Sequence, residues 1–478
     1  MKKHLVYIMT SVCAISVTNT FASNISTATI DNQTHIGITI YNNNLALIKD
    51  TRNISLKSGK NRLIFENVSA KIRPETATIN TLDKTNPVKL IEQNFDYDLL
   101  TPKKLLEKYV DRDIKIIRTN PATGLETILN ATVLSTNNGV ILQVGNHIET
   151  GIPERIQFPD MPDNLRSKPT LIIDLEQKNT SKQEFELSYL STGLSWKADY
   201  VARINSTETQ LDLNTWVTLT NQSGTSYQNA RLQLVAGDVN QVSNTRLNKR
   251  SFGREKMSLA MTSQVKEESL LDYHLYSLSN KTELLNNQTK QVALFSRTKI
   301  PITKTYRIKG SSYYYHGKHL TIDKKNNATI SLSFINNKKS NLALPLPKGI
   351  IRSYKNDSAN NLQFVGEDQI DHTAKGETVT LNLGKAFDVI ASKKQLDFKI
   401  LSKNNTARLV TEAKYEVVVK NAKDIAMSVL IEEPIPGDWK MITETHKHKK
   451  INSTIAQWAL PVSANGQTKL VYKVKVTH

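Results

Sequence analysis

Hydrophobic and polar residues alternate with a period of two along most of the chain. In one such run Leu211, Leu213 and Val217 fall on one side, whereas Asp212 and Asn214 fall on the other. This alternation is typical of β-strands that bury one face and expose the other. Comparable runs occur at residues 36–40, 60–65, 170–175, 184–190, 231–235, 328–334, 377–383, 396–400, 415–419, 425–431 and 469–476. Many short strands separated by turns predict a mainly β protein made of several antiparallel β-sandwich or barrel-like units.

Only one segment of the sequence has the features of a helix. Thr101 is a typical N-cap, Pro102 suits the first helical position, and the residues that follow favour a helix up to about Val110. One short helix near residues 102–110 is therefore predicted.

The breaks between patterned segments predict the domain organisation. Four prolines between residues 151 and 169 indicate a linker, and residues 241–270 are polar and follow neither period, which predicts a mobile loop. The predicted units, in chain order, are a signal peptide (1–22), an N-terminal β-unit (23–95), a helical connector (96–110), a small β-barrel or meander (111–150), the Pro-rich linker (151–169) and a large β-domain (170–478) in two parts, 170–240 and 271–478.

The start of the chain has the pattern of a secretory signal peptide. Lys2 and Lys3 form its basic part, residues 5–17 are mostly apolar, and small residues around Ala22 predict cleavage after that residue. The only cysteine of the chain, Cys13, lies inside this segment, so a thiol nucleophile and a disulfide framework are excluded for the mature protein. No later stretch has the length of apolar sequence that a transmembrane helix needs. The sequence thus predicts an exported protein, located in the periplasm, on the outer surface or outside the cell.

Basic residues outnumber acidic ones. The chain holds 63 Lys and Arg against 44 Asp and Glu, a formal net charge of +19. Such an excess suits a polyanionic partner, but its spread along the chain also fits a compositional bias in the coding sequence, which is the favoured explanation. The densest basic runs, residues 246–256 and 446–450, lack the interleaved aromatic residues of a nucleic-acid groove, so no nucleic-acid partner is expected.

Long, ordered motifs connect the chain to a known family. They include residues 187–202 (LSYLSTGLSWKADYVA), 344–354 (LPLPKGIIRSY), 364–377 (FVGEDQIDHTAKGE) and 431–441 (IEEPIPGDWKM). With these motifs the chain resembles the exported bacterial family of domain of unknown function 4139. The resemblance implies a β-rich exported protein and supplies no catalytic residues.

The sequence contains none of the motifs GxSxG, HExxH or GxxxxGK[ST]. Ser195 and Lys197 would share a strand face, but ordinary surface roles are favoured over a catalytic dyad. Trp196 and Trp216 are expected to pack in the core or between sheets, and residues 367–372 (EDQIDH) are expected to form a polar turn rather than an acid–base pair.

Residues 313–316 (YYYH) form the densest aromatic cluster of the sequence. In a strand, Tyr313 and Tyr315 would share one face, and Tyr314 and His316 the other. One pair is expected in the core, and the other is a candidate platform for a partner or a glycan. The candidate binding residues here are Tyr313, Tyr315 and His316.

A second candidate group is the basic run of His446, Lys447, His448, Lys449 and Lys450. On a strand the two histidines would point the same way, as a metal site in a β-protein needs. The sequence shows no evident acidic third ligand on that strand, and the neighbouring lysines would repel a cation. A solvated basic edge that binds an anionic partner is therefore favoured, and neither a metal site nor a cofactor is expected.

Three function classes stay open. The favoured one is a non-catalytic envelope protein that binds or scaffolds envelope components, such as anionic lipid, lipopolysaccharide or another envelope protein. The first alternative is a surface or secreted adhesin-like interaction protein. The second is a hydrolase acting on envelope polymers, with carboxylates brought together from distant segments.

Overall fold

The computed structural model describes residues 24–96, 99–151, 155–162, 165–237, 239–241, 273–319, 325–402 and 409–478, together with the backbone of residues 265–270. The predicted signal peptide (1–22) and most of the predicted loop at 241–270 lie outside these residues. The last part of that predicted loop forms a strand, β17 (Val265–Leu270). The predicted domain boundaries stay a prediction.

The prediction of a mainly β fold with one short helix is confirmed for the described residues. The helix α1 spans Pro102–Lys108 and so ends two residues before the predicted end. As expected, Pro102 lies in its first turn, and the Thr101 side chain caps it by accepting a hydrogen bond from the backbone N–H of Lys104 at 3.1 Å. Four short 3₁₀-helices also occur, η1 (Ile30–Asn32), η2 (Pro74–Thr76), η3 (Ser312–Tyr315) and η4 (Lys338–Ser340).

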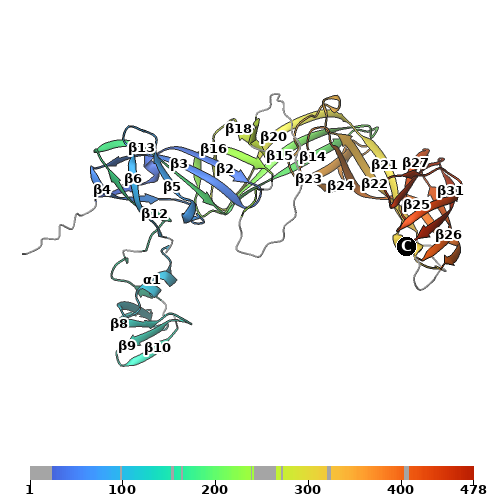
Figure 1. Cartoon of the computed structure of the whole chain (residues 1–478). Helices are drawn as coiled ribbons and strands as arrows, with labels where there is room; N and C mark the ends of the chain where they lie inside the picture. Colours follow the sequence, from blue (N-terminus) through green and yellow to red (C-terminus); the bar gives the residue numbers. More distant parts are fainter. Residues whose placement is uncertain are drawn as a thin grey trace, which may run out of the picture.

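The strands form five sheets (Figure 1). A four-stranded sheet has the order β1 (Asn24–Ala28), β4 (Gly59–Glu66), β12 (Thr170–Gln177) and β6 (Val88–Asp96). An eight-stranded sheet has the order β17, β18 (Tyr273–Leu278), β16 (Tyr227–Ala236), β2 (Gln33–Tyr41), β3 (Leu45–Leu56), β13 (Ser181–Ser191) and β5 (Thr78–Thr81), and β19 (Thr282–Leu284) also pairs with β16. Segments far apart in sequence therefore share both sheets.

Two five-stranded sheets follow. The smaller one has the order β10 (His147–Thr150), β9 (Ile141–Val144), β8 (Glu126–Ser135), β7 (Asp113–Thr119) and β11 (Arg155–Gln157). The larger one, called the central sheet below, has the order β20 (Gln288–Pro301), β15 (Gln210–Asn221), β14 (Leu194–Ile204), β23 (Gly349–Asn356) and β24 (Leu362–Ile370).

A nine-stranded sheet contains most of the C-terminal strands. Its order is β28 (Asp438–Glu444), β31 (Gly466–Thr477), β26 (Val410–Asn421), β25 (Thr378–Ser402), β22 (Asn326–Ile335), β21 (Thr303–Lys309), β27 (Met427–Pro434), β30 (Ile455–Val462) and β29 (Lys449–Lys450). In Figure 1 strands β26, β27 and β31 of this sheet (orange to red) lie at one end of the molecule and β4, β6 and β12 lie near the other, while the small sheet of β8, β9 and β10 is set off from the long axis.

Most strand pairs are antiparallel, as predicted, and the small sheet of β7 to β11 is antiparallel throughout, but the other sheets are mixed. Parallel pairs join β1 to β4, β2 to β16, β14 to β23 and β21 to β27. These parallel pairs arise because strands that follow one another in the chain often do not lie next to each other in a sheet. For example, β15 and β16 are joined by a short turn but lie in different sheets.

Two buried asparagines fix equivalent turns after long strands. The side-chain amide of Asn221 donates to the carbonyls of Thr225 and Leu284 at 2.9 and 3.0 Å. The amide of Asn421 likewise donates to the carbonyls of Ile425 and Ser463, both at 2.9 Å. Each amide thereby satisfies backbone acceptors where the chain leaves one strand for the next.

Three hydrophobic cores hold these sheets together. The largest joins the four-stranded, eight-stranded and central sheets and includes Leu332 and Phe334 of β22 and Val379 and Leu381 of β25, the second packs the rest of the nine-stranded sheet, and the third lies between α1 and the small sheet. Trp196 belongs to the largest core, as expected, and its indole N–H donates to the Val235 carbonyl at 3.2 Å. The expectation for Trp216 is wrong, since this side chain is 40% exposed. It stands on the face of β15 opposite to the buried Leu213 and Val217.

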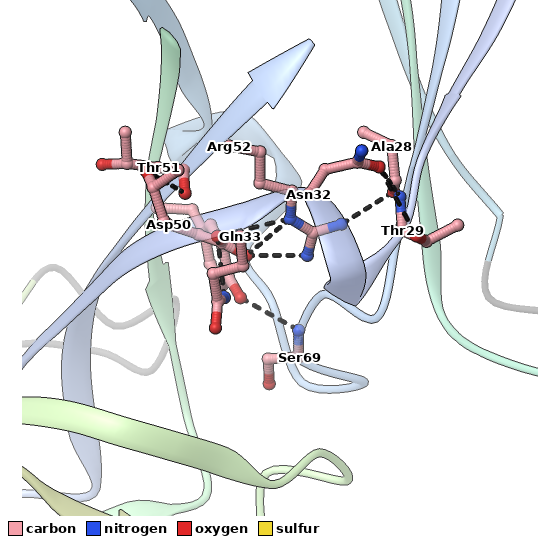
Figure 2. A network of polar contacts seen from close by, with 10 residues as sticks. Ala28, Thr29, Asn32, Gln33, Asp50, Thr51, Arg52 and Ser69 are labelled. Atoms are coloured by element: carbon pink, nitrogen blue, oxygen red, sulfur yellow. Dashed lines mark hydrogen bonds and ion pairs between the residues drawn. The ribbon is translucent and has the colours of Figure 1, made fainter.

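A buried ion pair lies between the first two sheets. Arg52 on β3 bonds Asp50 with Nη2 to Oδ2 at 2.7 Å, and their side chains are 0% and 4% exposed. The Arg52 guanidinium also donates to the Ala28 carbonyl of β1 at 2.7 Å and lies 3.9 Å from the ring centroid of Phe65 on β4. Figure 2 shows the guanidinium between Asp50 and Ala28. One side chain thus links strands of two sheets.

Replacing Arg52 should strongly destabilise this region. Arg52→Met leaves the Asp50 carboxylate buried without its counter-charge, which costs about 3–5 kcal/mol. Arg62→Met is the matched control, because Arg62 pairs with Asp174 at 2.8 Å while half exposed, and loss of such a surface pair costs ~0–1 kcal/mol. Urea unfolding, followed by hydrogen–deuterium exchange of peptides from β3 and β4, measures both effects. An Arg52→Met effect no larger than that of the control would contradict this account.

Candidate binding site

The candidate site is a pocket in the nine-stranded sheet. Strand β21 ends at Lys309 and β22 begins at Asn326, and beyond these two ends the described residues place no strand between β25 and β27. The pocket at this place has a volume of about 280 Å³. It is lined by Ile308, Lys309, Gly310, Ser311, Tyr314, Lys325, Asn326, Ala391, Ser392, Lys393, Val417, Ile431 and Glu433.

An ion pair forms the inner wall of the pocket. The Nζ of Lys393 on β25 lies 2.7 Å from the Oε2 of Glu433 on β27, and the two side chains are 11% and 2% exposed. The Tyr315 hydroxyl donates to the same carboxylate oxygen at 2.9 Å. A Cβ atom at Gly310 would collide with the Glu433 carboxylate, so a larger residue there would require this carboxylate to shift. The carboxylate is therefore held from three sides.

Aromatic rings surround the ammonium group of Lys393. Its Nζ lies 4.4 Å from the ring centroid of Tyr415, 4.8 Å from that of Tyr315, 5.6 Å from that of Tyr314 and 5.9 Å from that of Tyr472. These distances are in the range of cation–π attraction. The Tyr315 and Tyr472 hydroxyls share a hydrogen bond of 2.7 Å. The ring faces and Glu433 together replace the water that the ammonium group loses on burial.

Burial shifts the proton equilibria at this site. Desolvation lowers the pKa of Lys393, and the attraction and hydrogen bond of Glu433 act against that shift. Desolvation, followed by the nearby Glu433 charge, raises the pKa of Tyr315 and of Tyr472 well above the usual value. Both phenols therefore stay protonated and act as hydrogen-bond donors or acceptors rather than as bases.

The pocket lining is rich in donors and carries a positive excess. Besides the Lys393–Glu433 pair, the lining includes Lys309 and Lys325, whose residues are exposed, and the hydroxyls of Ser311 and Ser392. Glu433 is the one carboxylate among the lining residues, and Lys393 already balances its charge. An anionic group with few heavy atoms matches this lining in size and charge.

Comparison with known proteins places this region in a family. The family model described as "Domain of unknown function (DUF4139)" matches residues 185–478. The chain belongs to the DUF4139 family. The search of curated proteins returned no match. The matched region of DUF4139 contains all the residues that line the pocket.

The aromatic candidates of this DUF4139 protein, Tyr313, Tyr315 and His316, lie next to the pocket, but they do not form a strand. The prediction of strand alternation is wrong, because Ser311 caps a 3₁₀ turn, η3, with its hydroxyl accepting from the Tyr313 N–H. Tyr315 is fully buried beside Glu433, whereas Tyr313 is 66% exposed. The exposed His316 ring packs 4.8 Å from the ring of His478. Tyr315 is thus part of the site's inner wall, and Tyr313 and His316 lie outside it.

The basic candidates lie near a pair of tryptophans. His448 Nδ1 is 2.9 Å from Oε2 of Glu444, which ends β28, so an acidic partner that the sequence did not indicate lies beside this histidine. The His448 ring also lies 5.5 Å from that of Trp439 and 5.9 Å from that of Trp458. Lys447, Lys449, Lys450 and the half-buried His446 complete the group, and Lys450 Nζ lies 4.6 Å from the Trp439 centroid. Within the described part of the chain, no group of three or more His, Asp or Glu side chains is arranged to hold a metal ion.

One aromatic core connects the two candidate groups. Trp458 stacks on Tyr472 with centroids 4.9 Å apart, and Tyr472 bonds Tyr315. The basic run and the aromatic cluster therefore border the same core of the DUF4139 domain.

Two other predictions concern residues outside this core, and one of them differs from the structure while the other stays open. Residues 367–370, expected in a polar turn, belong to β24, and Ser195 and Lys197 share a face of β14 without evidence of chemistry.

Sequence reasoning missed the central pair of the site. Glu433 follows Val429 and Ile431 at the buried positions of β27. A carboxylate at a position that alternation predicts to be buried was the signal that could have indicated Glu433. No comparable signal marks Lys393, because it lies in a long run of mixed residues on β25.

Among the residues that the structure describes, no helix is long and apolar enough to cross a membrane.

Breaking the central pair should cost more than removing it. Lys393→Met leaves the Glu433 carboxylate buried and unpaired, with an expected loss of about 3–5 kcal/mol. The double variant Lys393→Met/Glu433→Met should recover most of that loss, since an apolar pair of similar volume needs no counter-charge. Urea unfolding followed by the fluorescence of Trp439 and Trp458 measures the free energies.

Lys423→Met is the matched control, because Lys423 pairs with Asp388 at 3.8 Å with both side chains partly exposed. It should change the free energy of unfolding by ~0–1 kcal/mol. If the double variant is as unstable as the sum of its two single variants, the pair is not the constraint described here.

Proposed function

We propose that this DUF4139 protein is an exported, non-catalytic envelope protein that binds an anionic group, such as a phosphate of a lipid or lipopolysaccharide, in the pocket beside Lys393. The observation that carries the proposal is the charge of the lining. Lys393 and Glu433 balance each other, so Lys309 and Lys325 supply an uncompensated positive field. Serine hydroxyls at the rim add neutral donors. Phosphate oxygens accept from both kinds of group.

The arrangement of the charged groups favours binding over turnover. Hydrolysis of a glycosidic bond uses two carboxyl groups on opposite sides of the scissile bond. The pocket lining has the single carboxylate of Glu433, and that group is held by Lys393 and Tyr315. This observation supports a binding protein over the alternative of a polymer hydrolase.

Export and charge fit an envelope partner. The signal-peptide pattern at the start of the chain predicts passage into the envelope, where phosphate-bearing lipids are abundant. Cleavage after Ala22 removes Lys2 and Lys3 and no acidic residue, so the exported protein carries a formal charge of +17 (61 Lys and Arg against 44 Asp and Glu), which favours approach to such a surface before the pocket is occupied. The exposed Lys447, Lys449 and Lys450 supply a second set of contacts within the same domain.

Vesicle binding tests the proposal. The protein should co-sediment with phosphatidylglycerol vesicles and not with phosphatidylcholine vesicles, and retention should fall steeply between low and near-physiological ionic strength because exposed charges are screened. Lys309→Gln/Lys325→Gln should weaken binding several-fold, since each contact contributes ~0–1 kcal/mol. The triple variant Lys447→Gln/Lys449→Gln/Lys450→Gln should also weaken retention.

The matched control is Lys338→Gln/Lys339→Gln, which removes the same charge at the exposed η4, away from the pocket lining. It should retain near-normal binding. Equal losses of vesicle binding in the pocket and control variants would show that net charge alone governs binding. Retention that responds neither to salt nor to any of the three variants would refute the proposal.

A further inference from the structure

The outward face of the central sheet carries a second set of polar and aromatic side chains. Its inward face belongs to the largest core, with Trp196, Leu213 and Val217 buried. On the outward face Trp216 of β15 is 40% exposed. It stands in register between Asp199 of β14 and Ala293 of β20. Ala293 is small, so the residue paired with Trp216 on β20 covers little of the indole ring.

A hydrogen-bonded row fixes the side chains next to Trp216. Arg352 of β23 donates from Nη1 to Asp199 Oδ1 at 2.9 Å, and its Nε lies 3.2 Å from Glu367 Oε2 on β24. The Thr218 hydroxyl donates to the other Asp199 oxygen at 2.5 Å. The Asp199 side chain is 8% exposed, whereas those of Arg352 and Glu367 are 34% and 51% exposed. The row is ordered and still presents hydrogen-bonding groups to solvent.

A second aromatic group marks the far side of the face. Phe364 on β24 is 56% exposed and contacts Tyr354 edge to face, with centroids 5.6 Å apart. The strand register places Phe364 three strands and four residues away from Trp216, a separation of about 20 Å at ordinary strand spacing and rise. Aromatic surfaces at both ends thus flank the polar row.

The charge of this face differs from that of the chain. At the outward positions of β14, β15, β23 and β24 the basic residues Lys197, Arg203 and Arg352 face the acidic residues Asp199, Asp212 and Glu367. On these four strands three charges of each sign balance, although the chain carries 63 basic and 44 acidic residues. A polyanion gains no net attraction from such a face. An uncharged chain with many hydroxyl groups finds both donors and acceptors there.

We propose that the outward face of the central sheet binds an extended, uncharged polysaccharide. One sugar ring stacks its C–H face on Trp216, another packs on Phe364, and the hydroxyl groups between them bond Arg352 and Glu367. Exposed tryptophan beside fixed polar groups supplies the contact area and the directional bonds that such a ligand needs. This site is separate from the lysine pocket and does not depend on the function proposed for it.

Affinity electrophoresis in native gels tests this site. Gels containing hydroxyethyl cellulose or dextran serve as neutral probes, and gels with polygalacturonate serve as the anionic comparison. At about 0.5 M salt, several-fold above physiological ionic strength, exposed charges are screened, and the protein should be retarded by at least one neutral polymer. Trp216→Ala should weaken that retardation roughly tenfold or more, and Phe364→Ala to a smaller extent.

Phe387→Ala is the control, because Phe387 is 88% exposed and lies on β25 outside this face. It should be retarded like the unaltered protein. Circular dichroism and vesicle binding check that the Trp216→Ala protein is folded and keeps its lysine pocket. Absence of retardation by both neutral polymers, or retardation unchanged in Trp216→Ala and Phe364→Ala, would overturn the proposal. So would retardation by polygalacturonate alone.

Discussion

The buried pair of Lys393 and Glu433 is the constraint on which the candidate pocket depends. Two charges taken out of water need partners in a fixed geometry, because an unpaired buried charge is far more costly than a paired one. The surrounding residues meet that need. Glycine at position 310 leaves room for the carboxylate, Tyr315 donates to it, and the rings of Tyr415 and Tyr472 lie against the ammonium group. The pocket lies beside this pair, beyond the end of β21 at Lys309 and the start of β22 at Asn326.

A second buried pair has an equivalent role at the other end of the molecule. Arg52 joins Asp50, the Ala28 carbonyl and the ring of Phe65, and so links two sheets. With Cys13 as the only cysteine of the chain, no disulfide can hold the sheets together. Hydrophobic burial supplies most of the stability, and the charged pairs restrict how the sheets register. This combination gives a β-rich protein with fixed surfaces on its nine-stranded and central sheets.

Local patterns in the sequence were sufficient to predict many of the strands, the mainly β class, the Thr101 cap and the burial of Trp196. Three features could not be read in this way. Lys393 and Glu433 are 40 positions apart and meet only through the order of the sheet. Tyr315 turned inward because Ser311 starts a 3₁₀ turn where alternation suggests a strand. Trp216 is exposed because it shares the side of Asp212 and Asn214, as the alternation implies, whereas the expected core packing rested on the spacing of its motif.

The central claim is that Lys393 is a buried, carboxylate-paired ammonium at an anion pocket. Its most direct test is the titration of lysine side chains by NMR in protein labelled with ¹³C at the lysine Cε, with Lys393→Arg used to assign the signal. The account predicts that Lys393 titrates below the exposed lysines, because desolvation lowers its pKa. Inorganic phosphate should raise that pKa, because a nearby anion favours the charged form. A Lys393 signal that titrates with the exposed lysines and ignores phosphate would contradict the account.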